Sequence, residues 1–252
     1  MIKLKSPEEI EKISASGKIL GKVFQTVSGE AKVGVNLKYL DSLAFGLIKE
    51  AGAEPAFLGY RPSGAKHPYR ASICASINEV VVHGIPNEYK LKNGDLLKLD
   101  FGVKYQGFYS DAALTMGIGD ISRIAALLIK ATKEALDKAI KTAKPGNHLG
   151  NIGFVINATA KKYGFKIVKG LTGHGIGIKL HEEPTVYNFG KRGEGMLLKP
   201  GMVLAIEPML SIGSEKIIQR PDESWATADN SLSAHFEHTV AITIAGPKIL
   251  TY

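Results

Sequence analysis

The sequence contains a single cysteine, Cys74, among its 252 residues. An internal disulfide and a cysteine-rich zinc site are therefore both excluded. No apolar run approaches the roughly 18 residues that a membrane-spanning helix needs. The acidic pair Glu8 and Glu9 stands where a signal peptide would be apolar. These absences predict a soluble protein of the cytoplasm.

Basic residues outnumber acidic ones by 32 to 24, so the formal net charge is +8. Such an excess could favour a polyanion such as ribosomal RNA, or it could reflect a basic proteome alone. The lysines are spread along the chain, and no arginine-rich arm with interleaved aromatic residues is present. Apolar residues make up 44% of the chain, which excludes wholesale disorder. Because no Ser/Pro-rich linker interrupts it, we expect residues 1–252 to form one domain.

Helical periodicity and capping residues predict four helices. The first begins after Ser6, which can form a capping box with Glu9, and the second begins after Asn36. The third follows Asp120, and the fourth covers about residues 149–163. Extended segments are expected at residues 96–103, 107–118, 202–206 and 236–244.

Similar tetrapeptides, residues 31–34 and 143–146, precede the second and the fourth helix. In each half, two helices precede a strand-rich stretch. This weak internal repeat predicts two related halves that contribute strands to a shared antiparallel sheet with helices on one face, an α+β fold.

Two aspartates flank a predicted hairpin. A chain reversal at Tyr105 and Gln106 places Asp100 directly opposite Asp111, with Cβ atoms roughly 4.5–5.5 Å apart. Gly107 leaves room for a longer turn, so this register stays open. Facing carboxylates repel unless a cation lies between them or one is protonated. The pair therefore indicates a metal site, although an aspartate that only ends a strand is the alternative.

Three further ionisable residues stand in apolar or glycine-rich surroundings: His174 between glycines, Glu207 before a proline, and Glu237 alternating with apolar residues. Each alone is compatible with a structural role. Four buried carboxylates, however, need compensating charge, and two divalent cations supply it. Oxygen donors with one nitrogen suit Mn²⁺, Fe²⁺, Co²⁺ or Zn²⁺. Paired cations would activate a water and polarise a carbonyl, so the set predicts metal-assisted hydrolysis.

Six segments follow one another in a specific order and spacing: residues 73–86, 173–177, 181–184, 198–202, 206–209 and 231–239. The series resembles the type I methionine aminopeptidases over nearly the whole chain. The resemblance implies a pita-bread fold, in which two pseudo-symmetric halves form a curved antiparallel sheet backed by helices. It also implies a centre of two divalent metal ions (Co, Mn, Fe(II) or Zn).

The resemblance assigns a role to each ligand candidate. Asp100 would bind one metal, His174 and Glu207 would bind the other, and Asp111 and Glu237 would bridge the two. Glu207 is also implied as the proton shuttle for the attacking water.

The resemblance further implies a substrate site. His83 and His181 would hydrogen-bond the peptide and stabilise charge on the scissile carbonyl, and Tyr60, Cys74 and Trp225 would line an apolar methionine pocket. The implied reaction is removal of the initiator methionine from nascent proteins when the next residue is small. A monomer without an N-terminal zinc-binding extension is expected, and the basic surface would permit a contact with the ribosome.

The chain departs from the family pattern at several positions. Gly102 and Ala112 stand where threonines are usual, Leu180 replaces a frequent phenylalanine, and His235 replaces a glutamine. Residues 61–70 resemble a short insertion. These departures leave every implied ligand intact.

Two other readings remain open. A proline-directed relative, such as a prolidase or aminopeptidase P, would share the fold but usually carries a sizeable extra N-terminal domain. A non-catalytic relative that binds RNA or a protein partner would suit the positive charge, but it would be expected to have lost metal ligands.

Overall fold

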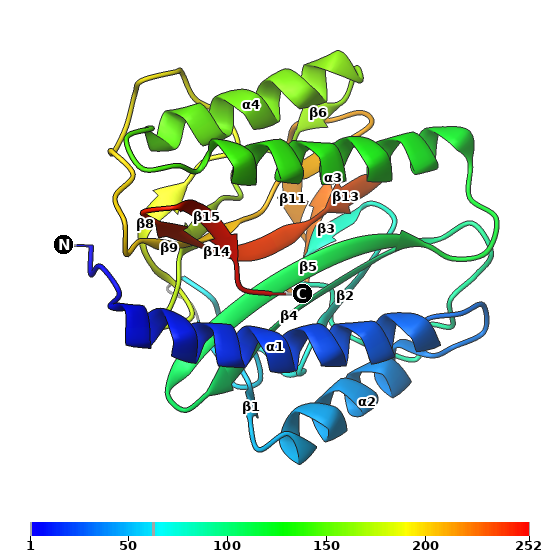
Figure 1. Ribbon diagram of the computed structural model, residues 1–252. Helices are drawn as coiled ribbons and strands as arrows, with labels where there is room; N and C mark the ends of the chain where they lie inside the picture. Colours follow the sequence, from blue (N-terminus) through cyan, green and yellow to red (C-terminus); the bar gives the residue numbers. More distant parts are fainter. Residues whose placement is uncertain (1, 62–63, 252) are drawn as a thin grey trace.

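The computed structural model describes residues 2–61 and 64–251. In this part of the chain the helices are α1 (Pro7–Glu30), α2 (Leu37–Glu50), α3 (Arg123–Thr142) and α4 (Leu149–Lys162). They form two pairs, α1 with α2 and α3 with α4 (Figure 1). None of these helices is long and apolar enough to cross a membrane.

The central sheet is antiparallel and runs in the order β1-β4-β5-β14-β9-β7-β8, with β2 paired to β4 and β15 paired to β14. Its strands are β1 (Glu54–Pro55), β2 (Cys74–Ile77), β4 (Leu96–Tyr105), β5 (Phe108–Gly117), β7 (Gly173–Gly175), β8 (Glu182–Val186), β9 (Val203–Ile206), β14 (Glu237–Thr243) and β15 (Gly246–Ile249).

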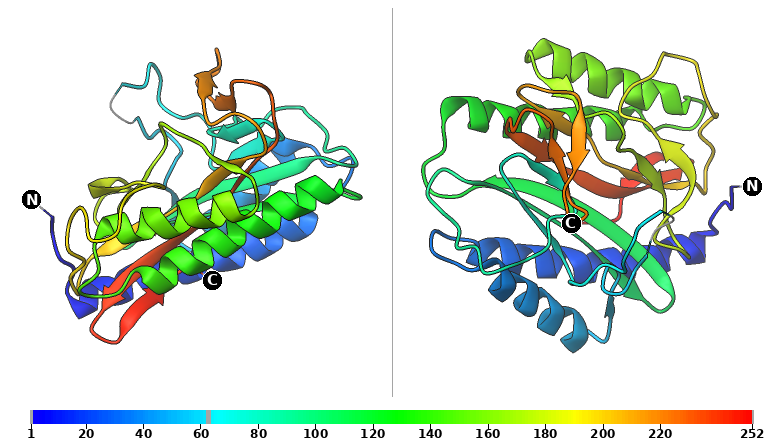
Figure 2. Two further views of the ribbon diagram at one scale, coloured as in Figure 1. Left: turned by 90° about the horizontal axis from the view of Figure 1, so that it is seen from above. Right: turned by 180° about the vertical axis from the view of Figure 1, so that it is seen from behind.

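Two small sheets accompany the central one, in the orders β13-β10-β6 and β11-β12-β3. Their strands are β3 (Val80–Val82), β6 (Lys166–Ile167), β10 (Met209–Ser211), β11 (Ile217–Gln219), β12 (Trp225–Thr227) and β13 (Ser233–His235). Figure 2 shows the helices on one side of the central sheet and long loops on the other. The expected α+β architecture is confirmed.

The two halves repeat the same local connections. Gly34 donates its N–H to the carbonyl of Leu91 at 2.7 Å, and Gly146 donates to Leu198 at 3.1 Å. Each contact ties the segment before the second helix of a half to the segment before a central strand. One apolar cluster gathers side chains of α1, α2 and β4, and another gathers those of α3, α4 and β9. The predicted pseudo-symmetry is confirmed.

Helix starts follow the capping residues. The Ser6 hydroxyl accepts from the N–H of Glu9 in a complete capping box, and the Asn36 side chain caps α2. The third helix begins at Arg123 rather than directly after Asp120, because Ser122 is its cap. The fourth helix ends at Lys162, within one residue of the expectation.

The β4–β5 hairpin turns at Gln106 and Gly107, not at Tyr105 and Gln106. Tyr105 pairs with Phe108, which leaves a two-residue loop whose φ angles are 50° and 81°. Two consecutive positive φ values are typical of the type I′ turn, whose twist matches that of the flanking strands. The expected register was therefore wrong by two residues.

This correction moves the aspartates but keeps them on one face. Asp100 pairs with Ala113, and Asp111 pairs with Gly102. Because side chains alternate with a period of two, a shift of two residues preserves the face. Glu237 of β14 pairs with Ala113 from its other side. The three carboxylates therefore project from neighbouring strands of the same sheet face.

Glycines on both sides of His174 let β7 lie close to its neighbours. A Cβ on Gly173 would lie 2.3 Å from the carbonyl oxygen of Ala205, and one on Gly175 would lie 2.2 Å from that of Glu183. Real Cβ atoms do not approach so closely, so these positions accept no side chain unless the backbone shifts.

The replacement Gly173→Ala is expected to lower the free energy of unfolding by about 1–3 kcal/mol, because the new methyl group overpacks against backbone. Gly46→Ala is the matched control: Gly46 lies in α2 with no atom within 4 Å of its added Cβ, and alanine there should stabilise by roughly 0.5–1 kcal/mol. Urea denaturation measures both. Equal effects at the two sites would contradict the close-approach argument.

Candidate metal centre

Alternation along β4 separates a core face from a site face. Leu97, Leu99 and Phe101 are fully buried in the cluster that contains α1 and α2. Asp100 and Lys98 therefore point to the opposite face. On that face Asp100 lines a cavity of about 990 Å³.

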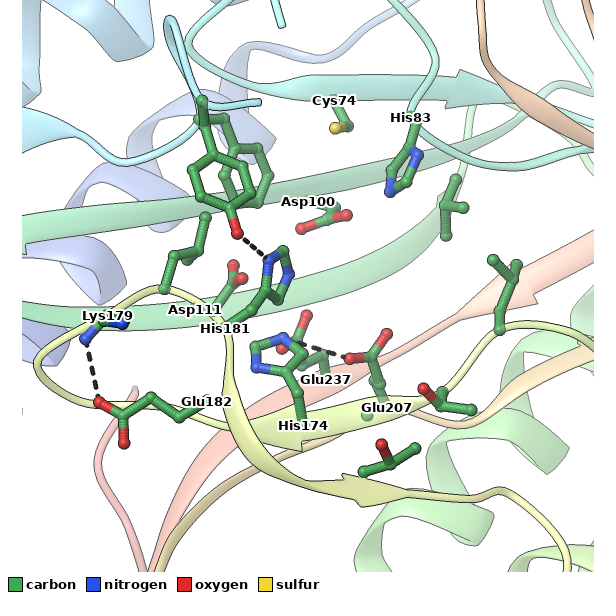
Figure 3. Close-up of a pocket in the computed structure, with 18 of the residues that line it drawn as sticks. Cys74, His83, Asp100, Asp111, His174, Lys179, His181, Glu182, Glu207 and Glu237 are labelled. Carbon is green, nitrogen blue, oxygen red and sulfur yellow. Dashed lines mark hydrogen bonds and ion pairs between the residues drawn. The ribbon is translucent and has the colours of Figure 1, made fainter. Parts of the chain in front are cut away.

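The five expected ligands converge in this cavity (Figure 3). Asp100, Asp111 and Glu237 come from β4, β5 and β14, His174 comes from β7, and Glu207 directly follows β9. Donor atoms of Asp111, His174 and Glu237 all lie within 4.8 Å of one another. The Nε2 atom of His174 is 3.6 Å from Oε1 of Glu207. The structure thus brings together residues that are up to 137 positions apart, from 100 to 237.

The four carboxylates are buried, with at most 8% of each residue exposed. Burial raises the pKa of Asp100 to about 7. Burial and the neighbouring carboxylates raise the pKa of Asp111, Glu207 and Glu237 well above the usual range. One oxygen each of Asp100, Asp111 and Glu237 has no hydrogen-bond partner among the described residues. Unpartnered buried oxygens around one cavity fit divalent cations.

The His174 ring presents the atom that a metal requires. Its Nδ1 lies 2.9 Å from the carbonyl oxygen of Gly175. A carbonyl can only accept, so Nδ1 carries the proton and Nε2 keeps its lone pair toward Glu207. Burial lowers the pKa of His174 to about 4, so the ring is neutral at physiological pH. A second hydrogen bond that fixes the tautomer is the usual arrangement of metal-binding histidines.

His181 and His83, the expected substrate-binding histidines, both line the cavity. The His181 Nδ1 atom lies 2.6 Å from the hydroxyl of Tyr60, and its ring lies 4.3 Å from that of His174 between centroids. Burial lowers the pKa of His181 to about 3 and also lowers that of His83. Both rings are therefore neutral and can donate one N–H each.

The loop that carries His181 is held by contacts of the neighbouring residue Glu182. Lys5 forms an ion pair with Glu182 at 2.6 Å, and the Lys5 side chain is only 2% exposed. Glu182 also accepts the backbone N–H groups of Ile178 and Lys179. These contacts fix the turn immediately before His181.

Two of the three expected pocket residues line the cavity. Tyr60 and Cys74 do, and burial raises the pKa of the Cys74 thiol well above its usual range, which fits a packing role. Trp225 is not among the lining residues; it packs with Val82 and Met209, which are.

Sequence reasoning missed several lining residues, including Phe57, Tyr69 and Met209. Tyr69 lies in the segment 61–70 that was expected to be an insertion, and its hydroxyl contacts the carbonyls of Ile73 and Gly84. Residues 62 and 63 of this segment lie outside the described residues. No periodicity signals these contributions, because the loop reaches the cavity only through the tertiary fold.

Lys98 is a further buried residue on the site face. Its Nζ donates to the carbonyls of Asn78 at 2.6 Å and Ser233 at 3.1 Å. Burial lowers the pKa of Lys98 to about 7. The signal was present in the sequence, since Lys98 and Asp100 are two residues apart on one strand.

Buried carboxylates and a neutral imidazole, gathered where the two halves of the sheet meet, form a candidate metal centre. A profile of metallopeptidase family M24 matches residues 11–244. The chain belongs to that family of hydrolases.

Relatives and solved structures agree with this membership. The chain is 47% identical to a methionine aminopeptidase of Aquifex aeolicus over 99% of this chain and 98% of the other, and 44% identical to one of Clostridium perfringens over 100% and 99%. The crystal structure of methionine aminopeptidase from Thermotoga maritima superposes with a TM-score of 0.95 at 40% identity, over 100% of this chain and 99% of that one. The resemblance to methionine aminopeptidases and the pita-bread fold are confirmed.

A prolidase from Pyrococcus furiosus shares the fold with a TM-score of 0.79 at 24% identity. The match covers 99% of this chain but 65% of the prolidase.

Metal removal is expected to lower the unfolding temperature, and the difference between metal-loaded and metal-free protein should be larger above pH 7 than below it. The ligands must be deprotonated to bind, and the pKa of Asp100 is raised from 3.8 to about 7, so protons compete with the cation below that value. His174 and His235 are already neutral near pH 7, so their protonation does not alter the pH dependence of metal binding there. Thermal unfolding with Mn²⁺ or with EDTA measures the difference, and a pH-independent difference would contradict the assignment.

Proposed function

We propose that the chain removes N-terminal methionine from polypeptides whose second residue is small, and that it uses two divalent cations to do so. The observation that carries the proposal is the convergence of four buried carboxylates and a neutral histidine on one cavity. The 40–47% identity to methionine aminopeptidases over the full chain supports the choice of substrate.

In the proposed centre Asp100 would hold one cation, His174 and Glu207 would hold the other, and Asp111 and Glu237 would be shared between the two. The mutual proximity of the Asp111, His174 and Glu237 donors supports the bridging roles. When bound, such cations lower the pKa of a water molecule and polarise the scissile carbonyl. The ligand set accepts Co²⁺, Mn²⁺, Fe²⁺ or Zn²⁺.

Glu207 is proposed as the residue that moves the proton. Its carboxylate takes a proton from the attacking water and delivers it to the departing amine. Burial and neighbouring carboxylates raise its pKa, which makes the carboxylate a stronger base than an exposed glutamate.

His181 is proposed to stabilise the carbonyl oxygen during attack. If the Tyr60 hydroxyl donates to Nδ1 of His181, the ring proton resides on Nε2 and can be donated to the substrate. His83 lines the same cavity and offers a second neutral N–H for the peptide.

The apolar part of the cavity is proposed to bind the methionine side chain. Phe57, Tyr69, Cys74 and Met209 line it, and a flexible thioether suits an apolar pocket of aromatic and sulfur-bearing residues. Trp225 would support Met209 from behind. The rings of Tyr60, His181 and His174 stand in a row, 5.1 and 4.3 Å apart between centroids. We propose that these three rings limit the size of the side chain that follows methionine in the substrate.

A monomeric state, a cytoplasmic location, a single domain and a ribosome contact through the +8 surface stay predictions.

The activity is tested by hydrolysis of Met-Ala-Ser, Met-Lys-Ser and Ala-Pro-Ala after EDTA treatment and re-addition of Mn²⁺ or Co²⁺. We expect metal-dependent release of methionine from Met-Ala-Ser alone. Cleavage of Ala-Pro-Ala alone would instead identify a proline-directed peptidase. Absence of cleavage with any metal would favour a non-catalytic relative.

The replacement Tyr60→Phe is expected to lower kcat about tenfold or more with a smaller effect on metal affinity, because it frees His181 Nδ1 to carry the proton. Steady-state kinetics on Met-Ala-Ser and calorimetric titration of Mn²⁺ measure the two effects. Tyr39→Phe is the control, since Tyr39 is exposed on α2 and lies outside the cavity. An unchanged kcat in Tyr60→Phe would contradict the proposal that the Tyr60–His181 contact sets the position of the His181 proton.

A further inference from the structure

His235 is a buried histidine that the proposed reaction leaves unused. It ends β13, is 1% exposed, and neither of its ring nitrogens has a hydrogen-bond partner among the described residues. Buried polar atoms are nearly always satisfied, and a side chain with two unsatisfied nitrogens therefore requires an explanation.

The surroundings of His235 explain why its two nitrogens lack hydrogen bonds. Its Nε2 atom lies 3.6 Å from Oε2 of Glu207 and 4.0 Å from Oε2 of Glu237. Both distances are too long for hydrogen bonds. Ligands that share one cation at bond lengths of about 2.1 Å lie roughly 3.0–3.5 Å from each other. Donor atoms of Glu207, His235 and Glu237 all lie within 4.8 Å of one another, which approaches this arrangement.

Glu207 consequently has an imidazole nitrogen near each of its oxygens. Oε1 faces Nε2 of His174 at 3.6 Å, and Oε2 faces Nε2 of His235 at the same distance. The two histidines come from β7 and β13, which belong to different sheets.

We propose that His235 is an additional metal ligand, which binds through Nε2 the cation held by Glu207 and Glu237. This inference rests on the proposed dinuclear centre and adds a second nitrogen donor to it. Imidazole favours Zn²⁺, Co²⁺ and Fe²⁺ over Mn²⁺, whereas carboxylate donors suit Mn²⁺. The glutamine that is usual at this position in the resembled family has no imidazole to offer. His235 thus biases this chain toward the nitrogen-preferring metals.

The direct test is a long-range ¹H–¹⁵N correlation spectrum of the histidine rings in the wild-type protein, recorded as Zn²⁺ is added to the metal-free form. We expect the Nε2 signals of both His174 and His235 to move from the lone-pair position to the metal-bound position. If His174 moves while His235 stays unbound or protonated at Nε2, the inference is wrong and the metal centre stands. If neither moves, the metal centre itself is wrong.

The replacement His235→Gln provides a second test. We expect the calorimetric affinity for Zn²⁺ to fall about tenfold or more, and that for Mn²⁺ to change much less. His238→Gln is the matched control: His238 lies on β14 beside Glu237, contacts Thr251 at 2.9 Å, and faces the other side of the strand. Equal losses for both metals, or for both variants, would overturn the inference. Unfolding curves of the metal-free variants show whether each variant folds. If His235→Gln does not fold, the spectrum of the wild-type protein alone tests the inference.

Discussion

Repulsion among four buried carboxylates is the constraint on which the rest of the structure depends. Asp100 and Asp111 belong to the first half of the chain, and Glu207 and Glu237 belong to the second. The first half alone brings Asp100 and Asp111 together on β4 and β5, and docking of the second half adds Glu207 and Glu237. The seam is closed by Thr239, whose hydroxyl accepts from the Asp111 N–H at 2.9 Å and donates to the Asp111 carbonyl at 2.8 Å. The same contact that joins the halves therefore brings the anions together, so cation binding and docking of the halves are energetically linked.

The scaffold restricts how these side chains can respond. The ligands stand on paired strands whose other face is packed against helices, so they cannot move away from one another without breaking the core. Gly173 and Gly175 bring His174 within reach by eliminating side chains where backbone carbonyls pass. Side chains on strands whose opposite face is packed against helices are positioned more precisely than side chains on loops.

Local sequence signals predicted what depends on local physics. Ser6 and Asn36 are caps because their side chains satisfy the first helical N–H groups, and that chemistry needs no tertiary information. The β4–β5 register was wrong because a two-residue type I′ turn needs positive φ at Gln106, a residue that gives no sign of it. The face of each aspartate was nevertheless right, since the error was an even number of residues.

The residues around the centre were predicted less completely. Asp100 and Asp111 were found from the predicted hairpin, and His174, Glu207 and Glu237 from their apolar or glycine-rich surroundings. The structure brings all five together. His235 was noticed only as a departure, because its surroundings come from strands distant in sequence. Lys98 was missed although it stands two residues from Asp100 on one strand. Trp225 lies behind the cavity wall for the same reason: β12 pairs with β3 and turns it toward the cluster with Met209.

The basic side chains nearest to these carboxylates do not neutralise them. Lys98 shares a strand face with Asp100 two residues away, yet its Nζ donates to the carbonyls of Asn78 and Ser233. The histidines that line or border the cavity are neutral because burial lowers their pKa. Had a lysine or a charged imidazole paired with the carboxylates, the ion pair would have satisfied them permanently. Because no such ion pair forms, the carboxylates keep an uncompensated negative charge that a cation from solution can neutralise. The histidines around them are neutral at physiological pH, so their nitrogen atoms can bind a cation without first losing a proton.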